Sequence, residues 1–95
     1  MAGFVVSAEA ESDLEAIGDF IYLDNPGRSV TFILEMTEYF RTIAERPLSF
    51  PNRNELAPKL RSAVYGRYLI LFEMGESEVR IVRVVHGARD LSSLF

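Results

Sequence analysis

The spacing of apolar and polar residues in the first part of the chain predicts a short strand followed by a helix. Phe4-Val5-Val6 is an apolar run of strand length. Ser7 comes next and can cap a helix, because its hydroxyl accepts from free backbone N–H groups in the first turn. We expect the helix from about Ala8 to Leu23. Its core line consists of Ala10, Leu14, Ile17 and Ile21, which recur at helical spacing.

A second helix is expected from Pro26 to about Arg46. Asn25 can cap it, and Pro26 suits its first position. Pro47 ends it, because proline lacks a backbone N–H and disturbs a helix interior. Its apolar residues cover about half of the circumference, which is wide for one contact and predicts packing on two sides. One line is Phe32, Met36, Tyr39 and Ile43, and the neighbouring line is Val30, Ile33, Thr37, Phe40 and Ala44.

Three strands are expected in the second half of the chain, after a loop over residues 47–58 that is rich in proline and asparagine. The first strand is Arg61–Tyr65. The next, Tyr68–Phe72, is apolar on both faces, which is typical of a central strand. Gly75-Glu76 forms a hairpin turn, after which Val79–His86 returns as the last strand.

These elements predict one α+β domain over residues 1–95, in the order β-α-α-β-β-β. Strands joined by short turns are antiparallel neighbours, and two helices in series cover one face of such a sheet. We therefore expect the N-terminal strand and a helical hairpin to pack on one face of an antiparallel sheet. The other face of the sheet is expected to be open.

Composition narrows the class of protein. Apolar residues make up 48% of the 95 residues, and there is no cysteine, so disulfides and thiolate-bound metals are excluded. No run approaches the roughly 20 apolar residues that cross a bilayer. The first residues also lack the basic start of a signal peptide. We expect a cytoplasmic protein that is neither exported nor embedded in a membrane, and that needs no metal or other cofactor.

Charge is distributed unevenly along the chain. The net charge is −4, which argues against non-specific nucleic-acid binding, because such binding depends on neutralising phosphates. Six acidic residues and no basic residue precede Arg28, so the first helix is acidic. Between Arg46 and Arg67 there are five basic residues and one acidic residue. This segment either forms a local basic patch or belongs to a mixed-charge surface.

Few residues have the chemistry of a catalytic group. His86 is the only histidine, and it lacks the partners of a zinc site or a Cys–His nucleophile. A hydrogen-bonding role at the end of its strand is favoured. Alternation along that strand places Arg83 with Val79, Ile81 and Val85. Because an unpaired buried charge is costly, Arg83 either lies on the open face or forms a salt bridge. The candidate neighbours are Arg61, Arg67 and Arg89 in the first case, and Glu73 or Asp90 in the second.

The first helix carries a second apolar line, well away from its core line. It consists of Ala16, Phe20 and Leu23. Exposed apolar surface of this kind often marks a binding site. The alternative is that the line extends the core of the domain.

The same features resemble ParE-type toxins of the RelE/ParE superfamily, the toxic half of bacterial type II toxin–antitoxin pairs. The similar segments cover nearly the whole chain in order. Residues 81–90, Ile-Val-Arg-Val-Val-His-Gly-Ala-Arg-Asp, are similar to the closing strand of that family. Similar positions elsewhere are Ala10, Asp13-Leu14 and Ile17 in the first helix, residues 43–47 at the end of the second, and Leu60-Arg61 with residues 66–72 in the preceding hairpin.

The resemblance implies a non-enzymatic toxin that poisons DNA gyrase. It also implies a hetero-oligomer with a ParD-like antitoxin, whose C-terminal segment wraps and neutralises the toxin. Operator DNA is then contacted only through the antitoxin. The expected antitoxin-binding residues are Ala16, Phe20, Leu23, Phe32, Met36 and Tyr39. The expected residues for target binding or toxicity are Arg61, Arg67, Arg83, His86 and Arg89.

Two alternatives to this function stay open. Toxins of the RelE branch cleave messenger RNA on the ribosome with basic residues of the sheet and a C-terminal tyrosine. RNA cleavage needs a general base and an acid, and this chain ends in residues 91–95, Leu-Ser-Ser-Leu-Phe, without a tyrosine. The other alternative is an interaction domain without toxicity. Gly18 departs from the family, where a large aromatic residue is expected; close packing by the second helix or by the antitoxin would account for it.

Overall fold

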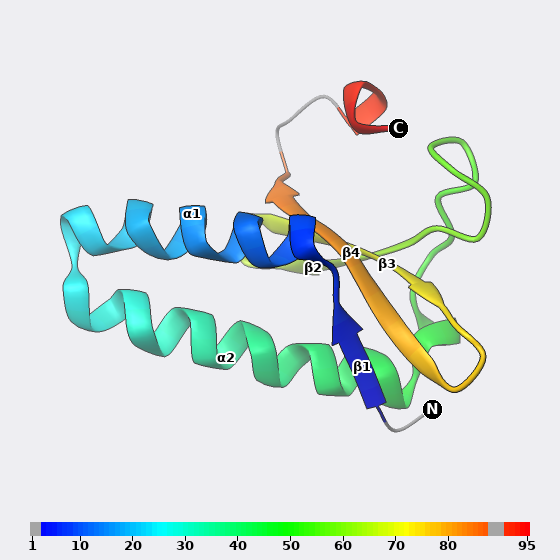
Figure 1. Cartoon of the computed structure of the whole chain (residues 1–95), viewed down its shortest axis with the longest axis horizontal. Helices are drawn as coiled ribbons and strands as arrows, with labels where there is room; N and C mark the ends of the chain where they lie inside the picture. The colour runs from blue at the N-terminus through cyan, green and yellow to red at the C-terminus, as the bar shows by residue number, and fades with distance from the viewer. Residues whose placement is uncertain (1–2, 88–90) are drawn as a thin grey trace.

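The computed structural model describes residues 3–87 and 91–95, and it shows a helical hairpin packed on a small sheet (Figure 1). Within these residues no helix has the length and hydrophobicity needed to cross a membrane. The elements are β1 (Gly3–Val6), α1 (Ala8–Asp24), α2 (Pro26–Glu45), η1 (Pro47–Ser49), β2 (Arg61–Tyr65), β3 (Tyr68–Met74), β4 (Glu78–His86) and η2 (Leu91–Leu94).

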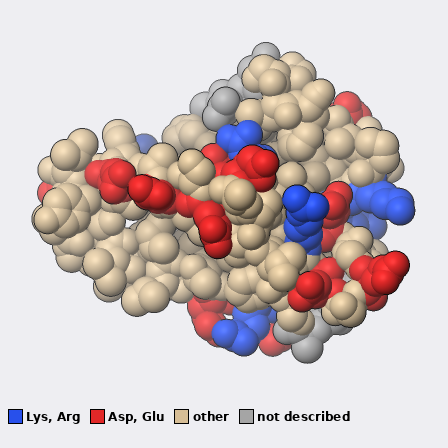
Figure 2. All heavy atoms as spheres, in the orientation of Figure 1, with Lys and Arg blue, Asp and Glu red and all other residues tan. Residues whose placement is uncertain are grey.

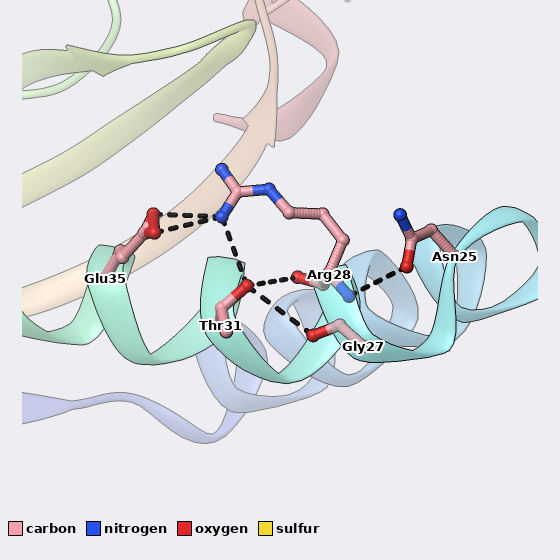
Figure 3. Close-up of polar contacts among 5 residues, drawn as sticks. All are labelled: Asn25, Gly27, Arg28, Thr31 and Glu35. Carbon is pink, nitrogen blue, oxygen red and sulfur yellow. Dashed lines mark hydrogen bonds and ion pairs between the residues drawn. The ribbon is translucent and has the colours of Figure 1, made fainter.

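The ends of both helices lie within one residue of their predicted positions. The hydroxyl oxygen of Ser7 accepts a hydrogen bond from the backbone N–H of Ala10 at 3.0 Å, so Ser7 caps α1 as expected. The side chain of Asn25 caps α2 in the same way, accepting from the N–H of Arg28 at 3.1 Å (Figure 3). Pro26 occupies the first turn of α2, where its missing N–H has no cost.

The sheet has the strand order β1-β4-β3-β2. β2 pairs antiparallel with β3, and β3 with β4, as the short turns predict. β1 pairs parallel with β4, with Val6 opposite Ile81. The expectation of a purely antiparallel sheet is therefore wrong for this edge, and the sheet is mixed. The reason is that the helical hairpin separates β1 from every other strand, so no turn in the sequence fixes its partner.

The main core lies between the helices and one face of the sheet. Phe40 is fully buried in it and packs edge-on against Phe4, with 5.7 Å between the ring centroids. α2 contributes most of the helical core residues, which confirms the broad apolar arc predicted for it. The largest buried side chains of this core are Met36, Phe40, Ile43, Ile70, Phe72 and Ile81.

The opposite face of the sheet is partly covered, and the prediction of an open face is wrong. Leu71 of β3 is fully buried on this side, although the helices lie on the other. A strand that is apolar on both faces needs cover on both faces. The segment before β2 and the η2 turn supply that cover. The residues that pack here are Leu56, Ala57, Leu60, Leu69, Leu71, Val82, Val85, Leu91 and Leu94.

A β-bulge changes which side chains of β4 face the helices. The register between β3 and β4 shifts between Leu71 and Phe72, which leaves Val82 without a partner in β3. The predicted alternation grouped Val79, Ile81, Arg83 and Val85 on one face, and it is wrong beyond the bulge. Val84 instead joins Val79 and Ile81 in the core under the helices, while Val85 packs on the opposite face.

Candidate partner-binding surface

The distal end of the helical hairpin projects beyond the sheet (Figure 1). No residue from Gly18 to Arg28 is buried. α1 packs against β4, and α2 packs against β1 and β4. The buried apolar residues of the two helices lie outside this end, at Ala10 and Ile17 on α1 and from Met36 onward on α2. Apolar side chains at the projecting end are therefore exposed to solvent on both sides of the hairpin.

The apolar line predicted on α1 lies on one of these sides. Phe20 is 71% exposed and Leu23 is 86% exposed, and Ala16 one turn earlier is exposed as well. Ala16, Phe20 and Leu23 are called the Phe20 surface below. These side chains do not extend the core of the domain, so the alternative interpretation of this line is excluded. Exposed aromatic and leucine side chains at neighbouring positions are typical of a protein-binding site.

Arg28, the basic residue of the hairpin end, lines one hollow together with Phe20 and Leu23. Figure 3 shows the polar contacts that hold its side chain. Its Nη1 donates to Oε1 of Glu35 at 2.9 Å and to Oγ1 of Thr31 at 3.2 Å. The guanidinium carbon lies 5.2 Å from the centroid of the Phe32 ring, close enough for a cation–π contact. Arg28 therefore covers part of Phe32, and its charge is compensated by Glu35.

The residues predicted on α2 contribute less surface than expected. Met36 has no exposed surface, so the expectation that it contacts a partner is wrong for this structure; its side of α2 faces the sheet. Phe32 and Tyr39 are half-buried, and both pack against Tyr65, with ring centroids 5.6 and 5.2 Å away. Each of these two side chains is therefore only partly accessible to a partner.

A second exposed apolar surface lies on the other side of the hairpin. It includes Tyr22 on α1 and Val30 and Leu34 on α2. Tyr22 follows Phe20 by two residues, about 200° around the helix, so the two side chains face opposite ways. Sequence reasoning missed this surface. One signal was present, because Leu34 falls outside both apolar lines of the second helix and is not needed for its core.

Acidic residues run along α1 between these surfaces. Figure 2 shows them as a row of red side chains on the helix. Glu11, Glu15 and Asp19 are all exposed and follow one another at intervals of one turn. Within the described residues, no group of acidic and histidine side chains has the arrangement of a metal site. The acidic row favours a basic partner, because complementary charges speed and orient association.

Arg83 is the candidate whose surroundings differ most from expectation. Its Nε and Nη2 donate to the two carboxylate oxygens of Asp13 on α1, at 2.7 and 2.9 Å. These hydrogen bonds raise the pKa of Arg83 above its ordinary value. The predicted salt bridge is therefore present, but its partner is Asp13, not Glu73, and Asp90 lies outside the described residues. The other interpretation, an Arg83 on an open face among arginines, is wrong.

The remaining basic candidates do not form a single cluster. Arg61 is tied to the loop, since its Nη1 donates to the carbonyl oxygen of Phe50 at 2.6 Å. Arg67 and His86 lie at one end of the sheet, where the N–H of Gly87 donates to the carbonyl of Arg67 and the His86 ring packs edge-on against a neighbouring tyrosine. Arg89 lies outside the described residues. Of the five predicted residues, the described part of the chain brings together only Arg67 and His86.

A family model for the ParE toxin of the type II toxin–antitoxin system parDE matches residues 4–91. The chain belongs to this ParE toxin family. No curated protein matches the sequence. Among solved structures, the ParE-family chain is similar to one titled "Chromosomal ParDE TA system from P. aeruginosa", with a TM-score of 0.76 at 18% identity. The match covers 90% of this chain and 96% of that chain, and it shows that the two share the fold.

Proposed function

We propose that this ParE-family chain is the toxin of a type II pair and that a ParD-like antitoxin neutralises it by binding the Phe20 surface. The exposure of Phe20 and Leu23 at the projecting end of the hairpin carries the proposal. An antitoxin segment that lays apolar side chains on them would remove this surface from water, as an amphipathic helix does in a groove. The acidic α1 supports a basic antitoxin segment. Toxin and antitoxin together would form a hetero-oligomer.

Introducing charge into the apolar contact tests the antitoxin site. Phe20→Asp combined with Leu23→Asp should weaken binding to the antitoxin by roughly a hundredfold, because buried apolar anchors dominate such interfaces. The partner is the cognate ParD-like antitoxin, which the proposal expects a short reading frame adjoining the toxin gene to encode, and the measurement is titration calorimetry. Leu48→Asp, at an exposed leucine of η1, is the matched control and should bind normally. Unchanged affinity of the double variant would refute the proposed site.

The proposed target of the free toxin is DNA gyrase, and the proposed action is non-catalytic. Cleavage of RNA needs a base, an acid and cationic stabilisation assembled around one phosphate. The arrangement of the described residues supports binding over cleavage, since the guanidinium of Arg61 is hydrogen-bonded to Phe50 and that of Arg83 to Asp13. With a net charge of −4, the chain would reach operator DNA only through the antitoxin. Gyrase inhibition also implies a cytoplasmic site of action.

Expression of the chain without its antitoxin separates the two toxin mechanisms. Gyrase supercoiling activity and the integrity of messenger RNA are measured in the same cultures. We expect supercoiling to fall while transcripts remain intact. Cut transcripts with normal supercoiling would contradict the gyrase proposal and favour a ribosome-dependent endoribonuclease of the RelE type. Normal growth would contradict both and favour an interaction domain without toxicity.

A further inference from the structure

A shallow groove of about 400 Å³ runs between α1 and α2 on the side of the hairpin opposite the Phe20 surface. Gly18 lines this groove, at the point where the two helices are joined by a hydrogen bond. The hydroxyl of Ser29 donates to the carbonyl oxygen of Gly18 at 2.6 Å. The apolar walls are Leu14 and Tyr22 on α1 and Val30, Ile33 and Leu34 on α2. This is called the Gly18 groove.

The packing of the two helices does not require glycine at position 18. A Cβ atom there would lie 3.6 Å from Cγ1 of Ile33 and 3.6 Å from Oγ of Ser29. Both distances are ordinary contacts, so alanine fits, and the expectation that close packing by α2 explains the glycine is not supported. Glycine within a helix costs about 1 kcal/mol relative to alanine. What the missing side chain provides is the depth of the groove.

The rim of the groove limits what can occupy it. Glu15 and Asp19 line its α1 side and are both exposed. A second copy of this chain would bring a second acidic row against the first, since no basic residue precedes Arg28, and like charges at an interface are unfavourable. A segment with a bulky apolar side chain flanked by lysine or arginine fits both the apolar walls and the acidic rim.

We infer that the Gly18 groove receives one large apolar side chain from a basic segment of the antitoxin and thereby determines which antitoxin binds. This inference rests on the proposed function, because it assigns the second side of the same hairpin to the same partner. An antitoxin that contacts both the Phe20 surface and the Gly18 groove binds the projecting hairpin on two opposite sides. Its specificity then depends on whether its anchor side chain fits the space that glycine leaves.

Filling the groove tests the inference. Gly18→Trp should weaken binding of the purified adjoining-frame antitoxin by roughly tenfold or more, as a blocked anchor pocket does. Gly18→Ala should change the affinity by roughly threefold or less, because its Cβ makes only ordinary contacts and most positions of an interface are nearly neutral when changed. Val30→Glu alters the opposite wall without touching α1 and should also weaken binding by roughly tenfold. Circular dichroism verifies that each variant is folded.

The salt dependence of binding tests the acidic rim. Replacing both Glu15 and Asp19 with lysine should weaken binding at low ionic strength and flatten its dependence on salt. Wild-type affinity in both Gly18→Trp and Val30→Glu would overturn the groove inference. If the Phe20→Asp, Leu23→Asp double variant still weakened binding in that case, the proposed function would stand without the groove inference. The isolated chain is tested for dimerisation in the same way: a concentration-dependent dimer that Gly18→Trp abolishes would overturn the groove inference. The groove would then hold a second copy of the chain.

Discussion

Asp13 is the residue that holds α1 against β4. Its carboxylate accepts three hydrogen bonds, two from Arg83 and one from the backbone N–H of Val84 at 2.9 Å. The Asp13 side chain is 15% exposed and that of Arg83 is 22% exposed, so water replaces these bonds poorly. Losing one partner leaves a mostly buried charge and a backbone donor without their hydrogen bonds, and both losses are costly.

Asp13→Ala should therefore lower the free energy of unfolding by about 2–3 kcal/mol. Urea denaturation of the isolated toxin measures it. Glu11→Ala removes an exposed acid from the same helix and should change stability by less than about 0.5 kcal/mol. Equal effects of the two substitutions would contradict the role assigned to Asp13.

The sequence predicted that Arg83 needs a partner, and it did not predict which one. The cost of burying a charge is a property of the residue, so it can be argued without a structure. The partner depends on where the last strand lies relative to the first helix. Asp13 precedes Arg83 by 70 residues. The β-bulge in β4 also changes which face of the sheet the residues after it point to. No local pattern in the sequence encodes that contact.

At the scale of elements, Ser7 joins three of them. β1 ends at Val6, and the backbone N–H of Ser7 continues its pairing by donating to the carbonyl of Ile81 at 2.9 Å. The Ser7 hydroxyl accepts from Ala10 to cap α1 and donates to the carbonyl of Val82 at 2.8 Å. The start of α1 is thereby fixed beside the bulge in β4.

Ser7→Ala should reduce stability by about 1–2 kcal/mol, because it removes both a helix cap and a hydrogen bond to a strand carbonyl. Thermal unfolding followed by circular dichroism measures the effect as a lowered melting temperature. Ser12→Ala, at an exposed serine of the same helix, is the matched control. A melting temperature as high as that of the control would show that Ser7 contributes no more than an exposed hydroxyl.

Elements that depend on nearby residues were predictable from the sequence. Serine, asparagine and proline fixed the helix ends, and Gly75-Glu76 marked the hairpin turn that the structure contains. The turn before β3 contains a second glycine, Gly66. Gly66 has a φ of +59°, which glycine adopts without strain. The pairing of β1 and the bulge were not predictable, because both depend on segments far apart in the chain. The Phe20 surface was predictable because its apolar residues lie on a different face of the first helix from the core line of that helix.

The whole molecule is built as a supported half and a projecting half. The sheet is covered by the helices on one face and partly by residues 56–60 and η2 on the other. This second cover was missed because the loop has no periodicity and η2 is a single short turn of four residues. The hairpin end has no comparable support (Figure 1), and its exposed apolar side chains lie on both of its sides. In the proposed function, the antitoxin covers this part of the molecule.

Native-state hydrogen exchange should reveal this division. Regions with few buried contacts open at lower free energy than the core. In the isolated toxin, backbone amides of residues 18–30, where Ser29 is the one buried residue, should therefore exchange faster than those of β3. Mass spectrometry of peptides from the two segments makes the comparison. The backbone amides of α2 around Met36, which is fully buried, are the internal control and should exchange slowly.

Addition of the antitoxin should slow exchange most strongly in residues 18–30, because binding on both sides of the hairpin stabilises the segment that lacks support. The Phe20→Asp and Gly18→Trp variants should each lose part of that protection, since they remove contacts on opposite sides. Protection that Phe20→Asp reduces, with Gly18→Trp indistinguishable from the wild type, would mean that the antitoxin binds the Phe20 surface alone. Equal protection of the hairpin end and of β3 in the isolated toxin would contradict the two-part description itself, because the projecting end would then be as stable as the core without any partner.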